Sequence, residues 1–195
     1  MKVRMIREQE QKTTVWSGGT TTELYLYPED GSYQDRHFTF RISTALCRDP
    51  VSDFTILKDT ERLLMPLEGE VTLIHADGKN VHLVPGEVDT FDGGLPTRSE
   101  GICRDFNLML KNKAKGEIKL WHLEEGQHRR LSLEHSVLGL YVVSGKGSVS
   151  GSAGTFPLGE HDFLLLAPGE TDRRAEFCVY SAGGLEAAYA KVCIQ

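Results

Sequence analysis

The sequence predicts an all-β protein made of two similar halves. Short runs of alternating apolar and polar residues recur along its 195 residues, and turns rich in glycine and proline separate them. No long stretch has the apolar spacing of a helix. Two segments of the first half reappear, in the same order, in the second half. These observations favour two β-rich units in tandem, each a sandwich or barrel of short strands.

The internal repeat sets the expected domain boundary. The matching pairs are Leu67–Val71 (L-E-G-E-V) with Val143–Gly147 (V-S-G-K-G), and Leu83–Asp89 (L-V-P-G-E-V-D) with Phe156–Asp162 (F-P-L-G-E-H-D). The number of residues that separates the two members of a pair is the same for both pairs to within a few residues. Both members of the second pair contain a G-E-x-D turn, as expected for a duplicated unit. A linker containing lysine and glycine, Asn112–Gly116, lies between the halves. We therefore expect an N-terminal domain at residues 1–112 and a C-terminal domain at residues 117–195.

A polar loop opens the first half. Trp16–Glu23 reads W-S-G-G-T-T-T-E and leads into the strand-like run Leu24–Tyr27. Loops of this composition often carry function. Equally, the segment can be a plain hairpin connection, with Gly18 and Gly19 supplying unusual backbone angles and Trp16 anchoring the core.

Two later strands carry polar side chains on one face. Gly101–Lys111 alternates with period two, which places Asp105 and Asn107 together and apolar side chains on the opposite face. His37–Ala45 places Arg41 and Ser43 together in the same way. A surface strand with an apolar back would show the same alternation. These short or planar hydrogen-bonding groups nevertheless suit a recessed, specific site better than a solvated face.

The remaining elements continue the β pattern. Arg62–Leu95 holds strand-like runs separated by the turns Asp77–Gly78 and Pro85–Gly86. After the linker, Glu117–Leu123 and Val137–Val143 resume the alternation, which supports a β-rich second half.

Charge and hydropathy exclude several classes of partner. The chain has 22 basic and 28 acidic residues, a formal charge of −6, so no basic surface for a nucleic acid is expected. No apolar run approaches the roughly 20 residues that cross a bilayer, and the N-terminus becomes charged before a signal-peptide core forms. We expect a cytoplasmic protein that binds neither nucleic acid nor membrane.

The cysteines do not form a recognisable motif. Cys47, Cys103, Cys178 and Cys193 are scattered without a C-x-x-C pair, so neither a zinc knuckle nor a redox motif is predicted. We expect buried free thiols. Cys103 shares the predicted face of Asp105 and borders the candidate site.

The turn-punctuated pattern resembles the cupin superfamily, whose fold is a double-stranded β-helix or jelly-roll barrel. The chain is similar to a bicupin, with two such barrels in tandem. More specifically, residues 12–195, most strongly those before Met109, resemble the HutD/Ves family. The motifs that carry this resemblance are W-S-G-G-T-T-T-E-L at Trp16, F-R-I-S-T-A at Phe40, E-R-L at Glu61, L-E-G at Leu67, F-D-G-G at Phe91 and D-F-N-L-M at Asp105.

This resemblance implies an association with histidine catabolism and a small ligand in the N-terminal barrel, without naming a reaction. Most cupin enzymes hold a metal through three imidazoles and a carboxylate. The seven histidines here include no H-x-H pair, and Arg62 stands where the typical cupin signature has its metal-binding glutamate. We therefore expect no metal and no other cofactor.

The leading hypothesis is a metal-free protein that binds a small carboxylate metabolite, such as urocanate or formylglutamate, in a regulatory or accessory role. Two arginines would pair with the carboxylate, because bidentate pairing gives specificity. The predicted ligand-binding residues are Arg41 and Arg62 for the anion, Ser43, Asp105 and Asn107 for orientation, and Trp16, Thr21 and Glu23 at the mouth of the site.

Two other classes of function stay open. An isomerase or hydrolase acting on the same metabolite would use Asp105 or Glu23 as a general base. A structural or regulatory interaction protein would leave the barrel empty. In each case an exposed sheet edge makes a homodimer a possible assembly.

Overall fold

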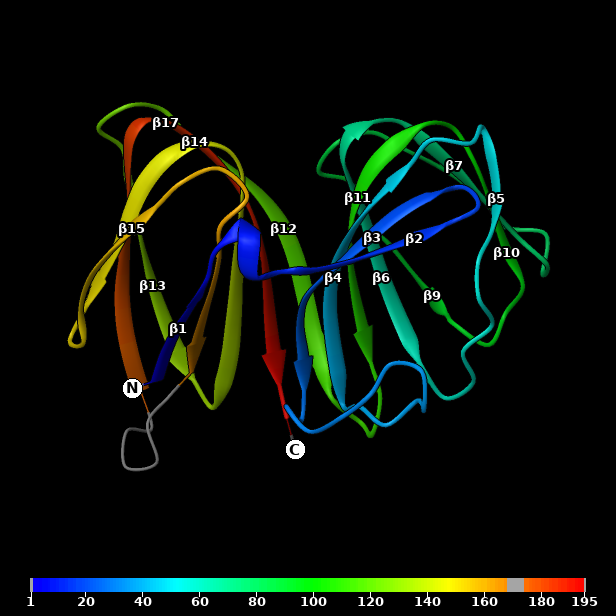
Figure 1. The fold of residues 1–195 in the computed structure, drawn as a ribbon, viewed down its shortest axis with the longest axis horizontal. Coiled ribbons are helices and arrows are strands. Elements are labelled where there is room, and N and C mark those ends of the chain that lie inside the picture. The colour runs from blue at the N-terminus through cyan, green and yellow to red at the C-terminus, as the bar shows by residue number, and fades with distance from the viewer. Residues whose placement is uncertain (1, 168–173, 195) are drawn as a thin grey trace. The chain divides into compact units, whose positions relative to one another are not determined.

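The computed structural model describes residues 2–167 and 174–194 and confirms the all-β prediction. Its strands pair antiparallel throughout the described residues, and the one helical segment there is the short 3₁₀ turn η1 (Glu8–Glu10). The chain forms two compact units, shown as ribbons in Figure 1: Lys12–Lys119 is the N-terminal unit, and the described parts of Met1–Gln11 and Leu120–Gln195 form the C-terminal unit. The described residues include no helix that is long and apolar enough to span a membrane.

The first strand belongs to the C-terminal unit, which differs from the domain boundary expected from the sequence. Strand β1 (Lys2–Ile6) pairs antiparallel with β16 (Phe163–Ala167). Val3 and Met5 pack against the apolar core of that unit. The sequence offered no signal for this arrangement, because the partner strand lies at the opposite end of the chain.

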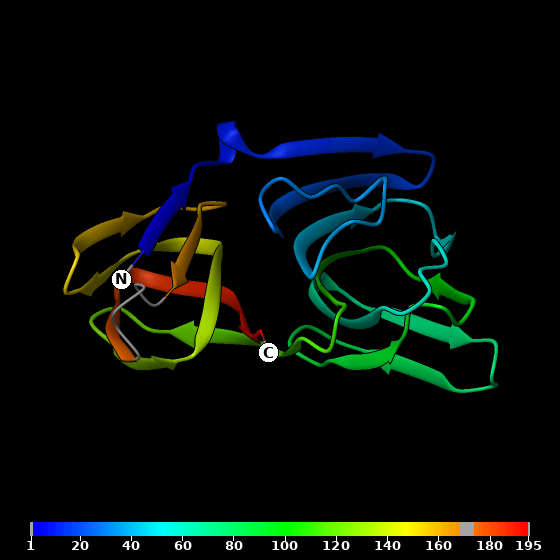
Figure 2. The ribbon, with the colours of Figure 1, turned by 90° about the horizontal axis from the view of Figure 1, so that it is seen from below.

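The N-terminal unit consists of two sheets that share one core. The six-stranded sheet has the order β2 (Lys12–Trp16), β3 (Gly19–Tyr27), β4 (Phe40–Cys47), β11 (Cys103–Leu110), β6 (Glu61–Gly69), β9 (Asp89–Asp92). The four-stranded sheet has the order β5 (Val51–Asp53), β10 (Thr97–Glu100), β7 (Val71–His75), β8 (Asn80–Leu83). Figure 2 shows these strands wrapped around a common interior. Between the described strands the sheets stay open and do not close into the barrel that the sequence suggested.

An apolar cluster joins the two sheets of this unit. It includes Leu64 and Phe91 from the six-stranded sheet and Leu73 and Leu83 from the four-stranded sheet, all buried. Two cysteines, Cys47 and Cys103, belong to the same cluster. Burial of these side chains therefore fixes which face of the six-stranded sheet lies inside the unit.

The C-terminal unit is built on two long bent strands. They are β14 (Ser136–Gly151) and β17 (Arg174–Cys193), and their pairing shifts register near Gly145, where the chain bends. The same sheet contains β12 (Lys115–Leu123), β13 (His128–Glu134), β15 (Gly154–Leu158), β1 and β16. Both halves of each long strand contribute to one apolar core. The bend thus lets one sheet cover itself, as the strong curvature of β14 and β17 in Figure 1 shows.

Removing residues 2–6 should lower the free energy of unfolding of the C-terminal unit by about 2 to 4 kcal/mol, because Val3 and Met5 leave its core and β16 loses a paired neighbour. Unfolding in urea would be followed by fluorescence of Trp121, which is buried in this unit, in a Trp16→Phe background. The matched protein with Trp121→Phe and Trp16 retained reports the N-terminal unit. Equal losses in both units would contradict the assignment of β1.

Candidate functional site

The inner face of the six-stranded sheet collects the polar residues that the sequence singled out. Residues opposite each other in neighbouring strands point to the same face, so register pairs form rows across β3, β4, β11 and β6. The rows are Leu26, Arg41, Met109, Arg62; then Glu23, Ser43, Asn107, Leu64; then Thr21, Ala45, Asp105, Pro66; then Gly19, Cys47, Cys103, Gly69. A β-bulge at Leu24 allows both Glu23 and Leu26 to lie on this face.

Both faces of the central strands are buried, which excludes the surface-strand interpretation. Asp105 and Asn107 on the inner face are each 4% exposed. Phe106 and Leu108, on the opposite face of β11, are each 0% exposed. The polar groups of this strand are therefore removed from water, and each needs a partner inside the protein or in a ligand.

Arg41 is held by its own neighbours. Its Nε atom donates to Glu23 Oε2 at 2.8 Å, and an Nη atom donates to Ser43 Oγ at 3.2 Å. The guanidinium also lies 4.3 Å from the centre of the Tyr33 ring. The structure thus brings three predicted site residues together, and the ion pair of Arg41 is made with Glu23 rather than with Asp105.

Arg62 is buried between aromatic rings. Its guanidinium carbon lies 4.6 Å from the centre of the Phe54 ring and 5.3 Å from that of Phe91. Burial lowers the pKa of Arg62 to about 10, and the negative charge of Asp105 opposes this shift. Within the described part of the chain, the Nε atom of Arg62 has no hydrogen-bond partner, and the side chain makes no ion pair within 4 Å. Arg62 is therefore a buried cation whose Nε donor is unused.

Asp105 and Asn107 present unused acceptors on the same face. The Oδ1 atom of each side chain is buried and has no hydrogen-bond partner among the described residues. The other carboxylate oxygen of Asp105 accepts from Cys47 Sγ at 3.9 Å. Burial raises the pKa of Asp105 to about 7, although Arg62, the Cys47 hydrogen bond and Arg41 all act to lower it. The site thus holds a buried acid, a buried amide and a buried guanidinium.

Trp16 and Thr21 lie at the edge of this face. Trp16 Nε1 donates to Thr21 Oγ1 at 3.1 Å, and the half-buried indole packs against the core cluster. A Cβ atom at Gly18 would lie 2.2 Å from the indole ring, so the ring needs glycine beneath it. These contacts give Trp16 an anchoring role. That Trp16 and Thr21 contact a ligand at the mouth of the site remains a prediction.

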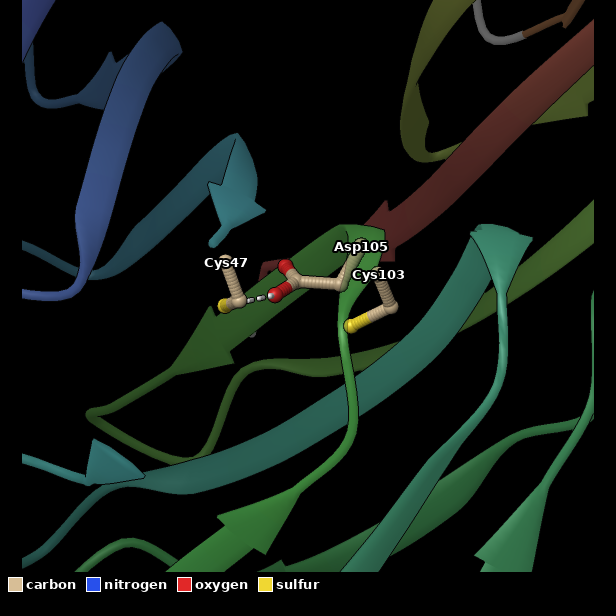
Figure 3. Close-up of side chains that lie close together, drawn as sticks. All are labelled: Cys47, Cys103 and Asp105. Carbon is tan, nitrogen blue, oxygen red and sulfur yellow. Dashed lines mark hydrogen bonds between the residues drawn. The ribbon is translucent and has the colours of Figure 1, made fainter. Parts of the chain in front are cut away.

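A pair of thiols adjoins Asp105, and sequence analysis identified only one of them. Cys47 stands opposite Cys103, and both side chains lie beside the Asp105 carboxylate, as Figure 3 shows. Cys103 was expected near the site, whereas Cys47 was missed because its pairing is not visible in the chain order. The available signal was alternation along β4, where Arg41, Ser43 and Cys47 are in phase.

The residues of the N-terminal unit do not fit the usual cupin metal set. The guanidinium of Arg62 occupies the position expected for the glutamate ligand and would repel a cation there. His75 is buried, with Nδ1 2.9 Å from Thr97 Oγ1 and Nε2 2.8 Å from Asp89 Oδ2, while His37 and His82 are exposed. Within residues 2–167 and 174–194, the group of potential ligand atoms that comes together belongs to Cys47, Cys103 and Asp105.

The raised pKa of Asp105 predicts a pH-dependent stability. Its pKa is about 7 in the folded chain against an ordinary value of 3.8, so the folded state binds the additional proton between these values. The contribution of Asp105 to the free energy of unfolding is therefore fully present below its unfolded-state pKa of 3.8 and is lost as the pH rises toward 7. Asp105→Asn should remove this loss, and its stability relative to wild type should increase by on the order of a few kcal/mol from about pH 4 to about pH 7.

Urea unfolding across that pH range would measure the difference. Asp53→Asn is the matched control, because the Asp53 side chain is 75% exposed and should leave the curve parallel to wild type. Parallel curves for Asp105→Asn as well would show that Asp105 ionises normally.

Comparison with known proteins supports the fold and assigns the family. A conserved protein of unknown function from Pseudomonas aeruginosa PAO1 superposes with a TM-score of 0.86 at 18% identity, and HutD from Pseudomonas fluorescens SBW25, in a formate condition, with 0.75 at 18%; both alignments cover 100% of each chain. The pirin YhhW from Escherichia coli, in complex with nickel(II), gives 0.69 at 11% over 97% and 98% of the two chains. No curated protein matches the sequence. The HutD family model matches residues 8–182, and this chain therefore belongs to the HutD family, with a cupin-like fold.

Proposed function

We propose that the N-terminal unit binds a small carboxylate metabolite on the inner face of its six-stranded sheet, in a regulatory or accessory role in histidine catabolism. The observation that carries the proposal is the buried guanidinium of Arg62, whose Nε atom has no hydrogen-bond partner among the described residues and which makes no ion pair there. Burial of a cation without an ion-pair partner is unfavourable, and a carboxylate ligand would supply the opposite charge and accept hydrogen bonds from the guanidinium.

The surroundings of Arg62 suit a planar anion. Phe54 and Phe91 hold the guanidinium in place, which reduces the conformational freedom that binding would otherwise cost. Arg41 lies two strands away in the same row, roughly 10 Å between backbones. It adds positive charge to this face, although Glu23 already occupies its Nε donor.

The acceptors of the site favour a ligand that also carries N–H groups. The Oδ1 atoms of Asp105 and Asn107 are buried and free to accept such donors. An acid with an imidazole, such as urocanate, or with an amide, such as formylglutamate, offers both kinds of group. The family to which the chain belongs motivates these two candidates. Recognition of this kind needs no metal.

Arg62→Gln should weaken binding of urocanate or formylglutamate by roughly ten- to a hundredfold, because a charge-assisted pair contributes about 1.5 to 3 kcal/mol. Isothermal titration calorimetry of the full chain would measure the change. Arg98→Gln is the control, since Arg98 is half exposed and pairs with Asp53.

Arg41→Ala should also weaken binding in the same titration. The protein should stay folded, because Glu23, which loses its ion-pair partner in this variant, is partly exposed to water.

Two results would count against the proposal. If neither acid, nor formate as the smallest carboxylate, gives heat or raises the melting temperature, a structural or interaction role is favoured, since a ligand of the native state must stabilise it. If urocanate absorbance falls by more than one equivalent per chain, the protein is an enzyme. Substitution of Asp105 and Glu23 would then test which is the general base.

A further inference from the structure

Two thiols and a carboxylate meet in the interior of the N-terminal unit. Cys47 ends β4 and Cys103 begins β11, and the two are register partners across the strand pair. Asp105 follows on the same face of β11. Figure 3 shows the three side chains close together, with the Asp105 carboxylate between the two cysteines in this view. One ligand atom from each lies within 4.8 Å of the other two, and each residue is 4% exposed.

Cys103 and Asp105 both oppose ionisation of the Cys47 thiol. The Cys47 thiol donates toward Asp105 Oδ2 at 3.9 Å. The pKa of the Cys47 thiol is raised by its hydrogen bond with Cys103, then by burial, and then by the negative charge of Asp105. No positive charge is among these causes, whereas Arg62 and Arg41 do act on Asp105. A cation placed between the sulfurs would reverse this balance and favour the ionised forms.

The Asp105 carboxylate has capacity for more than one partner. Asp105 Oδ1 is buried and has no hydrogen-bond partner among the residues described. One carboxylate can serve two partners, with one oxygen toward the sulfurs and the other toward the site around Arg62.

We propose that Cys47 Sγ, Cys103 Sγ and a carboxylate oxygen of Asp105 bind a thiophilic divalent cation of the zinc class. Thiolates select such ions over hard cations. Bond lengths of about 2.3 Å to sulfur and 2.0 to 2.2 Å to oxygen separate tetrahedral ligand atoms by roughly 3.5 Å. The 3.9 Å between Cys47 Sγ and Asp105 Oδ2 is close to this separation, so small side-chain movements complete the site.

The charges balance without a change of oxidation state. Each thiol loses its proton to solvent as a metal–sulfur bond forms. Two thiolates, one carboxylate and the dication leave a single net negative charge, which the buried Arg62 can compensate. Three protein ligands leave one position open to water or another small ligand. This site departs from the metal-free expectation and does not depend on the proposed carboxylate function.

Cobalt(II) titration of the reduced, chelator-treated full chain tests the proposal, because tetrahedral cobalt thiolates have a sulfur-to-metal charge-transfer band. We expect one cobalt per chain, release of two protons near neutral pH when Asp105 is ionised, and displacement by zinc with a rise in melting temperature. Cys47→Ser and Cys103→Ser should each lower cobalt affinity at least about tenfold.

Matched variants separate this site from the other cysteines. Cys178→Ser and Cys193→Ser remove the two remaining thiols, one half-buried and one exposed, and should leave the band unchanged. Asp105→Asn keeps both sulfurs and should bind cobalt more weakly, which gives a test even if a serine variant fails to fold. An unchanged band in the Cys47→Ser, Cys103→Ser protein, or no band in folded, reduced wild type, would overturn the proposal. Carboxylate calorimetry on the same metal-free sample reports the other site separately.

Discussion

The burial of charge on the inner face of the six-stranded sheet is the constraint on which the N-terminal unit depends. Arg62 and Asp105 are both removed from water, and desolvation moves their pKa values in opposite directions, to about 10 and about 7. Each charge lowers the cost of the other without a direct ion pair. The aromatic walls of Phe54 and Phe91 and the thiol of Cys47 supply the direct contacts that remain. Burying these charged groups lowers the free energy of unfolding, and ionisable groups with such shifted pKa values are typical of functional sites.

The two units treat polar groups differently although both are antiparallel β structures. In the N-terminal unit the inner face carries two arginines, an aspartate and an asparagine below 10% exposure. In the described part of the C-terminal unit, the core is formed by aliphatic and aromatic side chains. The buried charge there is Asp162, which pairs with Arg7 and accepts from the backbone of Gly159. Among the described residues, buried arginine, aspartate and asparagine side chains are therefore concentrated in the N-terminal unit.

Asp105 joins two kinds of chemistry. One oxygen faces the thiols, where positive charge is lacking, and the carboxylate as a whole experiences the field of two guanidiniums. The cupin-like fold supplies the strands that hold this arrangement. It does not bring the usual metal-binding imidazoles with it, because Arg62 replaces the glutamate ligand and both ring nitrogens of His75 are already hydrogen-bonded. The fold thus positions the side chains, and their identity determines what they bind.

Alternation along single strands is local, so the sequence was sufficient to predict the all-β class and the shared faces of Arg41 with Ser43 and of Asp105 with Asn107. The prediction that Arg62 belongs to the site came from the position of this residue in the cupin-like pattern. Only the tertiary structure decided what lies across the strands. Register pairs Cys47 with Cys103 and places Glu23 beside Ser43, within reach of Arg41, while β1 joins the C-terminal unit. These contacts join residues far apart in the chain. A register shift of one residue would move every side chain of a strand to the opposite face. Packing of the whole sheet therefore fixes the register, and no local sequence pattern can.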